Sequence, residues 1–387
     1  MKFKALAVRE GDSFLTEYEK DSKEIKVLVD GGEHKEDIVE LLKKEIPDKH
    51  INLIICTHYD SDHINGIIGL LEDGYKFDEI WLPEIIGSVA AIIGSEDVGK
   101  VLEGINNISE EEFKKLEKSD EGISMEFKDD FSKIEECKFD EKLSYNSDLC
   151  LCKSGHYTRY IYKNRLLKCR HCNNKKCDRY VEYTIFDTIA KTFRLMSLIT
   201  PKVIHKSKII WLKNTFSLVN NEISKDFDIV ALNSEKSRIR PYSLPSILRR
   251  IYYLSESNKE SLVFKFEYND YPNILFCADS NLQFSPAKES IKLKNNSIVT
   301  APHHGSKGNQ AAYNRITDGS SSGDESLIFV RSDRENPLAR PCDRYRKLTR
   351  KYCTRCNNGS SGENVELKLK EDMTFESNKA ECECIEK

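Results

Sequence analysis

The segment from residue 51 to residue 71 constrains the fold more than any other part of the 387 residues. A short apolar run, Ile51–Cys56, has the length and composition of a buried strand. It is followed at once by the polar cluster His58-Tyr59-Asp60-Ser61-Asp62-His63, and then by Ile64–Leu71, whose apolar residues predict a helix. A polar cluster at the end of a buried strand is typical of functional sites in α/β proteins.

The cluster has the composition of a metal site. Imidazole and carboxylate ligands together suit Zn²⁺ or Mn²⁺, and alternating positions on a tight turn can direct them to two adjacent ions. These candidate ligands are His58, Asp60, Asp62 and His63. The alternative is a turn in which an aspartate caps the following helix and the histidines are incidental. Four such residues within six positions favour metal binding.

The segments on either side predict an α/β domain. Strands are expected at Phe3–Val8, from Phe14, at Ile25–Val29 and at Ile80–Pro83, with a helix from about His34 to Glu45. Strand patterns return at 209–212, 227–232, 262–266, 274–276 and 298–300. We therefore predict one α/β hydrolase domain split into 1–84 and 186–340, an insertion at 85–185, and an extension at 341–387.

Two more polar groups follow strand-like segments far along the chain. Cys277-Ala278-Asp279 follows the strand expected at 274–276, and Pro302-His303-His304-Gly305 follows the one at 298–300. A turn aspartate or a buried histidine would explain either group alone. Because both recur at strand ends, where α/β folds gather functional groups, we expect them to join the first cluster.

These blocks resemble the metallo-β-lactamase superfamily, and within it the hydrolase domain of competence DNA-uptake (ComEC-like) proteins. The resemblance rests on Val8–Ser13, Val27–Gly32, Thr57–Gly66, and Asn258–Asp279 with Pro302–Ser306, and covers roughly 1–84 and 195–335. Asp60 stands where the wider superfamily has a second histidine, and the DNA-uptake branch also has an aspartate there. The resemblance implies an αββα sandwich, here with a Cys-rich insertion and a C-terminal extension.

The resemblance also implies a two-ion site of Zn²⁺ or Mn²⁺. His58 and Asp60 would bind one ion, Asp62 and His63 the other, and Asp279 would bridge them. His304 occupies the slot of the family's last histidine ligand, which leaves His303 as an orienting or substrate-contacting group and a candidate general acid. Asp62 would also orient the water that the ions activate.

This sequence departs from the family's pattern at two places. Ala278 replaces the usual glycine before the bridging aspartate. The wider superfamily supplies one more histidine ligand between the first motif and Asp279. Here that interval offers His156, His171 and His205, none of them in a recognisable motif. By this resemblance one ion would be weakly held or completed by water.

The insertion carries a second candidate metal site. Cys150, Cys152, Cys169 and Cys172 have the spacing of a structural zinc site, with Cys177 or His171 as substitutes. Free thiols are the alternative. Residues 153–179 also hold nine Lys or Arg against one acid, with interleaved tyrosines, which suits nucleic acid as well as a solvated face. Candidate nucleic-acid contacts are Lys175, Lys176 and Arg179.

Two cysteine pairs lie near the C-terminus. Cys353-Thr354-Arg355-Cys356 closes a second basic stretch, and Cys382-Glu383-Cys384 lies close to the end of the chain. The two pairs could together complete another four-cysteine zinc site. Unpaired thiols in a frayed terminal segment are the competing reading.

Charge and hydropathy narrow the functional classes. The net charge of −4 argues against a chain that binds polyanions by its overall charge, so contacts to nucleic acid must come from local patches. Neither a signal peptide nor a membrane-spanning run is evident, so we expect a cytoplasmic protein with reduced thiols and no membrane partner. We predict a metal-dependent phosphodiesterase or nuclease, in foreign-DNA defence or nucleic-acid processing. The alternatives are a small-molecule ester, amide or thioester hydrolase, and a non-catalytic nucleic-acid binder.

Overall fold

A computed structural model describes residues 1–95, 149–151, 157–159, 180–204, 206–239, 261–284, 290–317, 326–332, 341–356 and 362–384. The chain divides into two compact units. The first comprises Met1–Ile86, Ser197–Arg238 and Ser257–Lys387, and the second comprises Gly87–Met196 and Ile239–Glu256. The first unit holds the two large sheets and every described residue of the candidate site.

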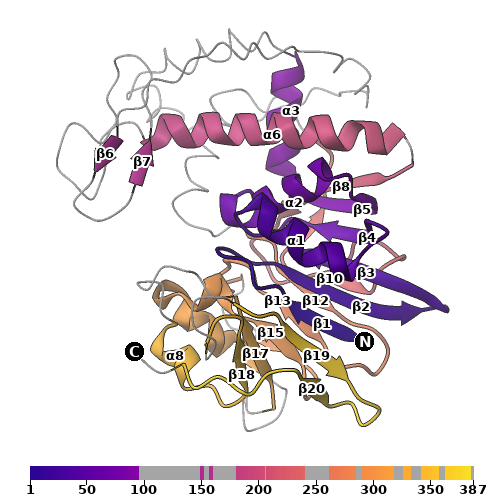
Figure 1. Cartoon of the computed structure of the whole chain (residues 1–387), viewed down its shortest axis with the longest axis vertical. Helices are drawn as coiled ribbons and strands as arrows, with labels where there is room; N and C mark the ends of the chain where they lie inside the picture. The colour runs from indigo at the N-terminus through magenta and orange to yellow at the C-terminus, as the bar shows by residue number, and fades with distance from the viewer. Residues whose placement is uncertain are drawn as a thin grey trace. The chain divides into compact units, whose positions relative to one another are not determined.

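The first large sheet has nine strands and contains the N-terminal strands of the chain (Figure 1). In spatial order they are β11 (Ser234–Lys236), β8 (Lys208–Asn214), β5 (Lys76–Pro83), β4 (His50–Ile55), β3 (Lys23–Val29), β2 (Phe14–Lys20), β1 (Lys2–Ala5), β19 (Val365–Leu369) and β20 (Phe375–Ser377). The strands β3, β4, β5 and β8 run parallel, and the other neighbours are antiparallel. Because β4 is one of the parallel strands, the polar cluster that follows it lies at the edge of the sheet where these strands end.

The second large sheet has seven strands. In spatial order they are β18 (Lys351–Cys353), β17 (Ile328–Arg331), β15 (Ile298–Thr300), β13 (Ile274–Phe276), β12 (Phe264–Phe266), β10 (Ile229–Ala231) and β9 (Asn221–Glu222). Within this sheet the neighbours β13, β15, β17 and β18 are parallel, so the chain leaves β13 and β15 at the same edge. Two short strands, β14 (Ile291–Lys292) and β16 (Ile316–Thr317), pair separately.

Apolar side chains of both large sheets meet in one buried cluster. Phe3 and Phe14 of the first sheet lie 6.4 and 6.3 Å, ring centre to ring centre, from Phe276 of the second. A second cluster covers the seven-stranded sheet with the 3-10 helix η3 (Lys307–Arg315) and the short helix α8 (Asp343–Arg346). The mixed α/β class predicted from the sequence is thus confirmed.

Two helices follow the parallel strands of the first sheet. Helix α1 (Lys35–Glu45) buries Ile38 and Leu42, and α2 (Ser61–Glu72) buries most of its apolar residues. Helix α2 begins three residues earlier than its apolar pattern predicted. Asp60 occupies its N-cap position but makes no capping hydrogen bond through its side chain. The capping interpretation of Asp60 is therefore wrong, and Asp62 and His63 lie in the first helical turn.

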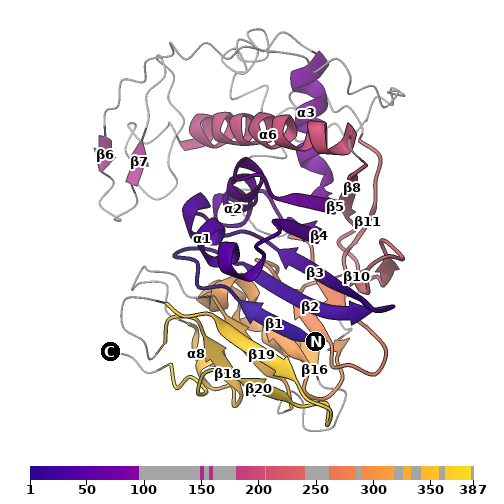
Figure 2. The ribbon, with the colours of Figure 1, turned by 45° about the vertical axis from the view of Figure 1, so that its right-hand side comes forward.

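The structure adds elements that the sequence patterns did not predict. Helix α6 (Tyr180–Ile204) spans 25 residues, and β19 lies beside β1 in the first sheet (Figure 2). Val365 and Leu367 of β19 are fully buried. Residues 341–384, treated above as an extension, therefore belong to the first compact unit.

The second unit contains most of α3 (Glu84–Ser95), most of α6, and the antiparallel pair β6 (Leu149–Leu151) and β7 (Tyr157–Arg159). Cys150 is part of strand β6. The other candidate zinc ligands of the insertion, and Lys175, Lys176 and Arg179, lie outside the described residues. No described helix is long and apolar enough to cross a membrane.

A close backbone contact sets the position of α2. Gly66 of α2 lies against Gly31, which follows β3, so that a Cβ atom on Gly66 would stand 1.8 Å from the Gly31 carbonyl oxygen. The Gly66 amide also donates to the Gly32 carbonyl at 2.9 Å. Only a residue without a side chain permits this approach.

We predict that Gly66→Ala lowers the free energy of unfolding by about 3 kcal/mol, because the backbone on both sides leaves no room for a methyl group. Urea unfolding followed by circular dichroism would measure the loss. Gly308→Ala is the control, since its Cβ would meet only Ser306 Oγ at 3.7 Å, and it should change stability by less than about 0.5 kcal/mol. Equal stability of the two variants would contradict the prediction.

Candidate metal centre

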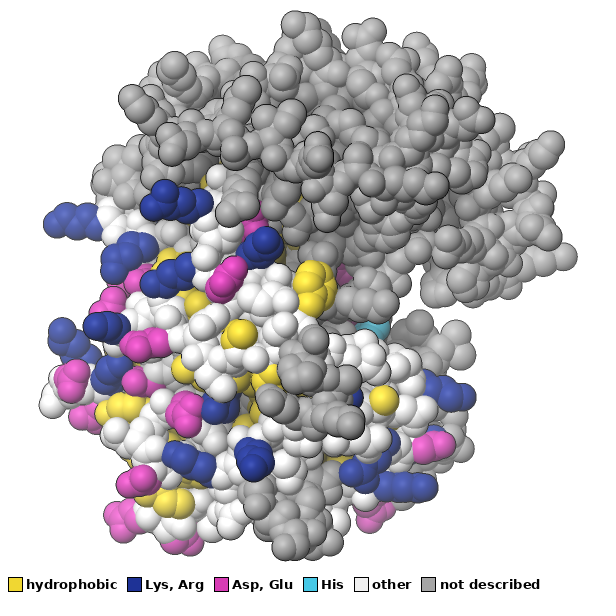
Figure 3. All heavy atoms as spheres, turned by 180° about the vertical axis from the view of Figure 1, so that it is seen from behind, with side chains coloured by type: hydrophobic (Ala, Val, Ile, Leu, Met, Phe, Trp, Pro, Cys, Tyr) yellow, Lys and Arg dark blue, Asp and Glu magenta, His cyan; other side chains and the backbone are white. Residues whose placement is uncertain are grey.

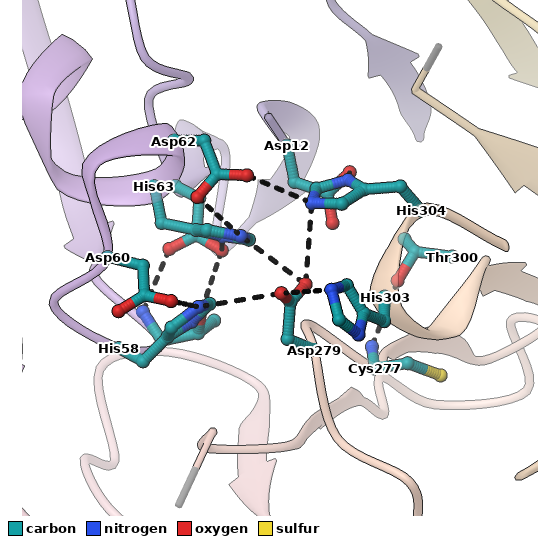
Figure 4. A network of polar contacts seen from close by, with 12 residues as sticks. Asp12, His58, Asp60, Asp62, His63, Cys277, Asp279, Thr300, His303 and His304 are labelled. Atoms are coloured by element: carbon teal, nitrogen blue, oxygen red, sulfur yellow. Dashed lines mark hydrogen bonds and ion pairs between the residues drawn. The ribbon is translucent and has the colours of Figure 1, made fainter. Parts of the chain in front are cut away.

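Side chains from three strand ends converge on one buried place (Figure 4). The loop after β4 and the start of α2 bring His58, Asp60, Asp62 and His63. The loop after β13 brings Asp279, and the loop after β15 brings His303 and His304. The structure thus brings together all the residues that the sequence singled out for this site.

The buried carboxylate of Asp30, at the end of β3, orients His63. Its Oδ1 accepts the Thr57 amide at 2.8 Å, while Oδ2 accepts the Thr57 hydroxyl at 2.7 Å and the His63 Nδ1–H at 2.8 Å. When the ring is neutral, an Nδ1–H donated to a carboxylate leaves the lone pair on Nε2, which is directed away from that carboxylate. This is the arrangement that surrounds metal-binding histidines.

Asp12 plays the same part for His304. Asp12 Oδ1 accepts His304 Nδ1–H at 2.9 Å, and both side chains are buried. The main chain holds Asp12 in place, because its amide donates to the Asp62 carbonyl at 3.2 Å. Gly11, with φ of +91°, permits this close approach, since a Cβ atom at Gly11 would lie 1.8 Å from the backbone carbonyl oxygen of Asp62. His58 Nδ1 instead contacts the Thr57 hydroxyl at 3.0 Å.

Three imidazole nitrogens converge without hydrogen-bond partners in the part of the chain that the structure describes. They are the buried Nε2 atoms of His58, His63 and His304. Burying a polar atom without a hydrogen-bond or metal partner costs folding free energy. Their nearest polar neighbours are carboxylate oxygens that also lack acidic hydrogens when ionised. A divalent cation would satisfy both kinds of atom.

Asp279 lies between two groups of these ligands. Its Oδ1 is 3.4 Å from Nε2 of His63 and 3.4 Å from Nε2 of His304, which in turn lies 3.3 Å from Asp62 Oδ2. Tetrahedral ligands at about 2.1 Å from one ion are separated by about 3.4 Å. The spacing of this first group, Asp62, His63, Asp279 and His304, therefore fits one metal ion.

The other oxygen of Asp279 faces a second group. Its Oδ2 is 3.8 Å from His58 Nε2 and 3.2 Å from His303 Nε2. Asp60 Oδ2 lies 3.8 Å from the same His58 nitrogen. Asp279 thus has one oxygen toward each group, as a carboxylate that bridges two ions would.

The histidine loop has an unusual backbone. His303 and His304 have φ of +48° and +52°, and Gly305 continues with +79°. Left-handed conformations are uncommon for residues with side chains and recur at functional sites. The backbone turn presents His303 and His304 on the two sides of Asp279.

The two loops are also joined to each other. The His303 amide donates to the Ala278 carbonyl at 2.8 Å, and the Cys277 amide donates to the Thr300 hydroxyl at 2.9 Å. Ala278 itself has φ of +46°. This positive φ explains the glycine that the resembled family has there, and this chain keeps the conformation with a methyl group, at a cost of about 1 kcal/mol.

The carboxylates dominate the electrostatics of the site. Burial lowers the pKa of His58 to about 4, with the neighbouring His63 acting in the same direction. Burial alone would also lower the pKa of His304, but the charges of Asp12 and Asp279 outweigh it and raise the pKa to about 9. The pKa of His63 is likewise raised against burial, mainly by Asp30 and Asp279. Without a metal the site therefore attracts positive charge.

Solvent reaches the site from one side. Asp60 and His303 have side chains that are 29% exposed, whereas those of His63, Asp279 and His304 are no more than 4% exposed. The two nearby thiols, Cys56 and Cys277, are fully buried and burial raises their pKa values. Buried thiols with raised pKa values are poor nucleophiles at neutral pH.

Sequence reasoning quoted Asp12 and Asp30 within the family blocks but gave them no role. Each lies in a turn with glycine, where an aspartate is ordinary. Their roles depend on partners 292 and 33 residues away along the chain. His156, His171 and His205, the remaining histidines considered as ligands, lie outside the described residues.

Residues 10–75 match the family model of the metallo-β-lactamase superfamily. The match includes the turn with Asp12, the strands β2 to β4, both helices, and the whole cluster from His58 to His63. A search of curated proteins finds no match. The partial match, together with the mixed α/β fold and the converging ligands, indicates a metal-dependent hydrolase.

Proposed function

We propose that this chain is a two-metal phosphodiesterase that acts on nucleic acid. The observation that carries the proposal is the position of Asp279, which has one carboxylate oxygen toward each of two ligand groups. Two bound divalent ions, Zn²⁺ or Mn²⁺, would activate a water molecule and neutralise charge on the phosphoryl oxygens. We also infer the αββα sandwich of the resembled superfamily and a relationship to its DNA-uptake branch.

The chain's own residues would hold the ions as two sets. Asp62, His63 and His304 would hold one ion, His58, Asp60 and His303 would hold the other, and Asp279 would contribute to both. His303 then takes the place of the histidine that the wider superfamily supplies from elsewhere. This assignment follows from its 3.2 Å contact with the Asp279 oxygen that faces His58.

The residues around the ions orient the reactants. Asp30 and Asp12 fix the tautomers of His63 and His304, so that Nε2 of each remains available. The Asp62 side chain is 13% exposed, and its carboxylate could accept a proton from an attacking water.

The ligand set favours phosphodiesters over lactams or thioesters. Asp60 adds a hard oxygen ligand at a position where the wider superfamily has imidazole, and carboxylate-rich sites favour metals that bind phosphate oxygens. Two stretches of the sequence, 153–179 and 331–355, each carry nine Lys or Arg. In the second stretch Arg331 and Lys351 are buried. The stretch 153–179 is therefore the one that we propose for the phosphate contacts that the net charge of −4 does not supply.

We assign the nucleic-acid contacts to the insertion, with Lys175, Lys176 and Arg179 as the residues to test. On the face shown in Figure 3, the described Lys and Arg side chains are interspersed with Asp and Glu and form no separate basic patch. Substituting glutamine for all three should weaken binding of a labelled oligonucleotide at least tenfold in a gel-shift assay, and hydrolysis of bis(p-nitrophenyl) phosphate should not change. A gel shift that survives the substitutions would remove the insertion from the proposal.

The substrate class can be tested with purified protein. We expect hydrolysis of bis(p-nitrophenyl) phosphate and of DNA or RNA, lost on chelation and restored by Zn²⁺ or Mn²⁺. Asp62→Asn should lower kcat at least 100-fold, while Asp73→Asn at the other end of α2 should leave it unchanged. Turnover of lactones or thioesters but of no phosphodiester would overturn the proposed substrate.

Asp30→Asn should weaken metal binding by a factor of about 10 to 100, the range for loss of an orienting carboxylate. The amide keeps the size of the side chain but offers an N–H to His63 Nδ1, which favours the tautomer with its proton on Nε2. Competition with a chromogenic chelator would measure the affinity. Asp78→Asn, which alters the exposed pair with His50, is the matched control and should bind metal as the unmodified chain does.

The variant His303→Gln distinguishes two roles of His303, that of a metal ligand and that of a proton donor. As a ligand, His303 holds one ion, so the variant should retain about one equivalent of metal fewer at the active site than the unmodified chain. As a general acid alone, it would leave the metal content unchanged, and kcat would fall more for poor leaving groups than for p-nitrophenolate. Elemental analysis together with a leaving-group series distinguishes the two roles, and unchanged metal content would contradict our assignment.

A further inference from the structure

Four cysteines form a cluster of their own in the first unit, apart from the site described above. Cys353 ends β18 and Cys356 lies in the turn after it, whereas Cys382 and Cys384 follow β20. All four Sγ atoms lie within 4.8 Å of one another. Cys353, Cys382 and Cys384 are buried, and Cys356 is half-buried.

The spacing of the sulfur atoms is that of ligands around one ion. Cys384 Sγ lies 3.5 Å from Cys353 Sγ, 3.9 Å from Cys356 Sγ and 3.0 Å from Cys382 Sγ. A disulfide would require about 2.05 Å. Zinc–sulfur bonds of about 2.3 Å in a tetrahedron place the sulfurs about 3.8 Å apart. None of these distances is that of a disulfide, and two of them, 3.5 and 3.9 Å, are close to the separation around a tetrahedral zinc ion.

The backbone around the cluster holds the thiols together. Cys384 has φ of +48°, and its amide donates to Cys382 Sγ at 3.2 Å. The Cys382 amide donates to the Lys351 carbonyl at 2.7 Å, which ties the last described segment to β18. Cys353, Cys382 and Cys384 also pack in the second apolar cluster, which accounts for their burial. Four thiols offer one another only weak hydrogen bonds, so a shared ion is the stronger reason for their Sγ atoms to meet.

Positive charge lies beside the cluster. Lys379 Nζ donates to the carbonyls of Cys353 and Thr354, each at 3.2 Å. Zinc bound by four thiolates carries a net charge of about −2, and a neighbouring ammonium group stabilises it. The same lysine would have no such role beside four neutral thiols.

We propose that Cys353, Cys356, Cys382 and Cys384 bind one structural zinc ion that fastens the two large sheets together. Cys353 ends β18, the edge strand of the seven-stranded sheet, and Cys356 lies in the turn after it. Cys382 and Cys384 follow β20, the edge strand of the nine-stranded sheet. All four positions are protein thiols, so the ion has no open position for a substrate. This proposal is independent of the substrate of the catalytic site.

The test counts zinc in the full chain with the catalytic ligands removed by His63→Ala and Asp279→Ala. Adding Cys382→Ser and Cys384→Ser to this variant should lower the zinc content by one equivalent, whatever other cysteines bind. Adding Cys342→Ser, which removes a buried thiol outside the cluster, should not change it. An unchanged zinc count after the double serine substitution, or iron in place of zinc, would overturn the proposal.

A second measurement needs no cysteine variant and so does not depend on the folding of one. Alkylation of the unmodified chain followed by mass spectrometry should label Cys356 and Cys384 at least tenfold faster after zinc is removed with a chelator. X-ray absorption at the zinc edge of the variant lacking the catalytic ligands should show sulfur neighbours at about 2.3 Å. Equal labelling rates, or thiols that react only after a reductant is added, would contradict zinc binding.

Discussion

The buried carboxylate of Asp30 ties together the parts of the chain that form the site. Asp30 directly follows β3, and its carboxylate receives hydrogen bonds from the Thr57 amide and hydroxyl after β4 and from His63 in α2. The ends of β3 and β4 and the first turn of α2 are thus fixed to one side chain. Gly31 and Gly66 allow α2 to approach closely enough for this arrangement. A charge buried in this way is stable only with several partners, which makes the whole group of contacts interdependent.

The second half of the site depends on the other sheet. Because β13 and β15 are parallel neighbours, the chain leaves both at the same edge, and Asp279 and His304 meet there. Arg331 of β17 donates from Nε to the His304 carbonyl at 2.7 Å, and the Thr354 amide donates to the Arg331 carbonyl at 3.2 Å. The histidine loop is therefore joined through one strand to the segment that carries the cysteine cluster.

Both clusters share one physical feature: several possible metal-ligand atoms converge with few or only weak hydrogen bonds among them. In the candidate metal centre these are the buried imidazole nitrogens around Asp279, and near the C-terminus they are four thiols. The two clusters differ in chemistry. Carboxylates and imidazoles on a partly exposed edge suit ions that also bind water, whereas a closed set of thiolates suits a structural ion. The left-handed backbone at His303 and His304 belongs to the first cluster and that at Cys384 to the second.

Local patterns in the sequence predicted most of the first sheet and the central strands of the second, because apolar periodicity and turn residues act over a few positions. They also predicted the candidate ligands from His58 to His63, with Asp279 and His304, since each follows a strand directly. They did not predict β19 as the neighbour of β1, the orienting roles of Asp12 and Asp30, or the meeting of Cys353 with Cys384. Each of these depends on strand pairing or packing between residues far apart in the chain, and only the tertiary structure decides which distant residues meet.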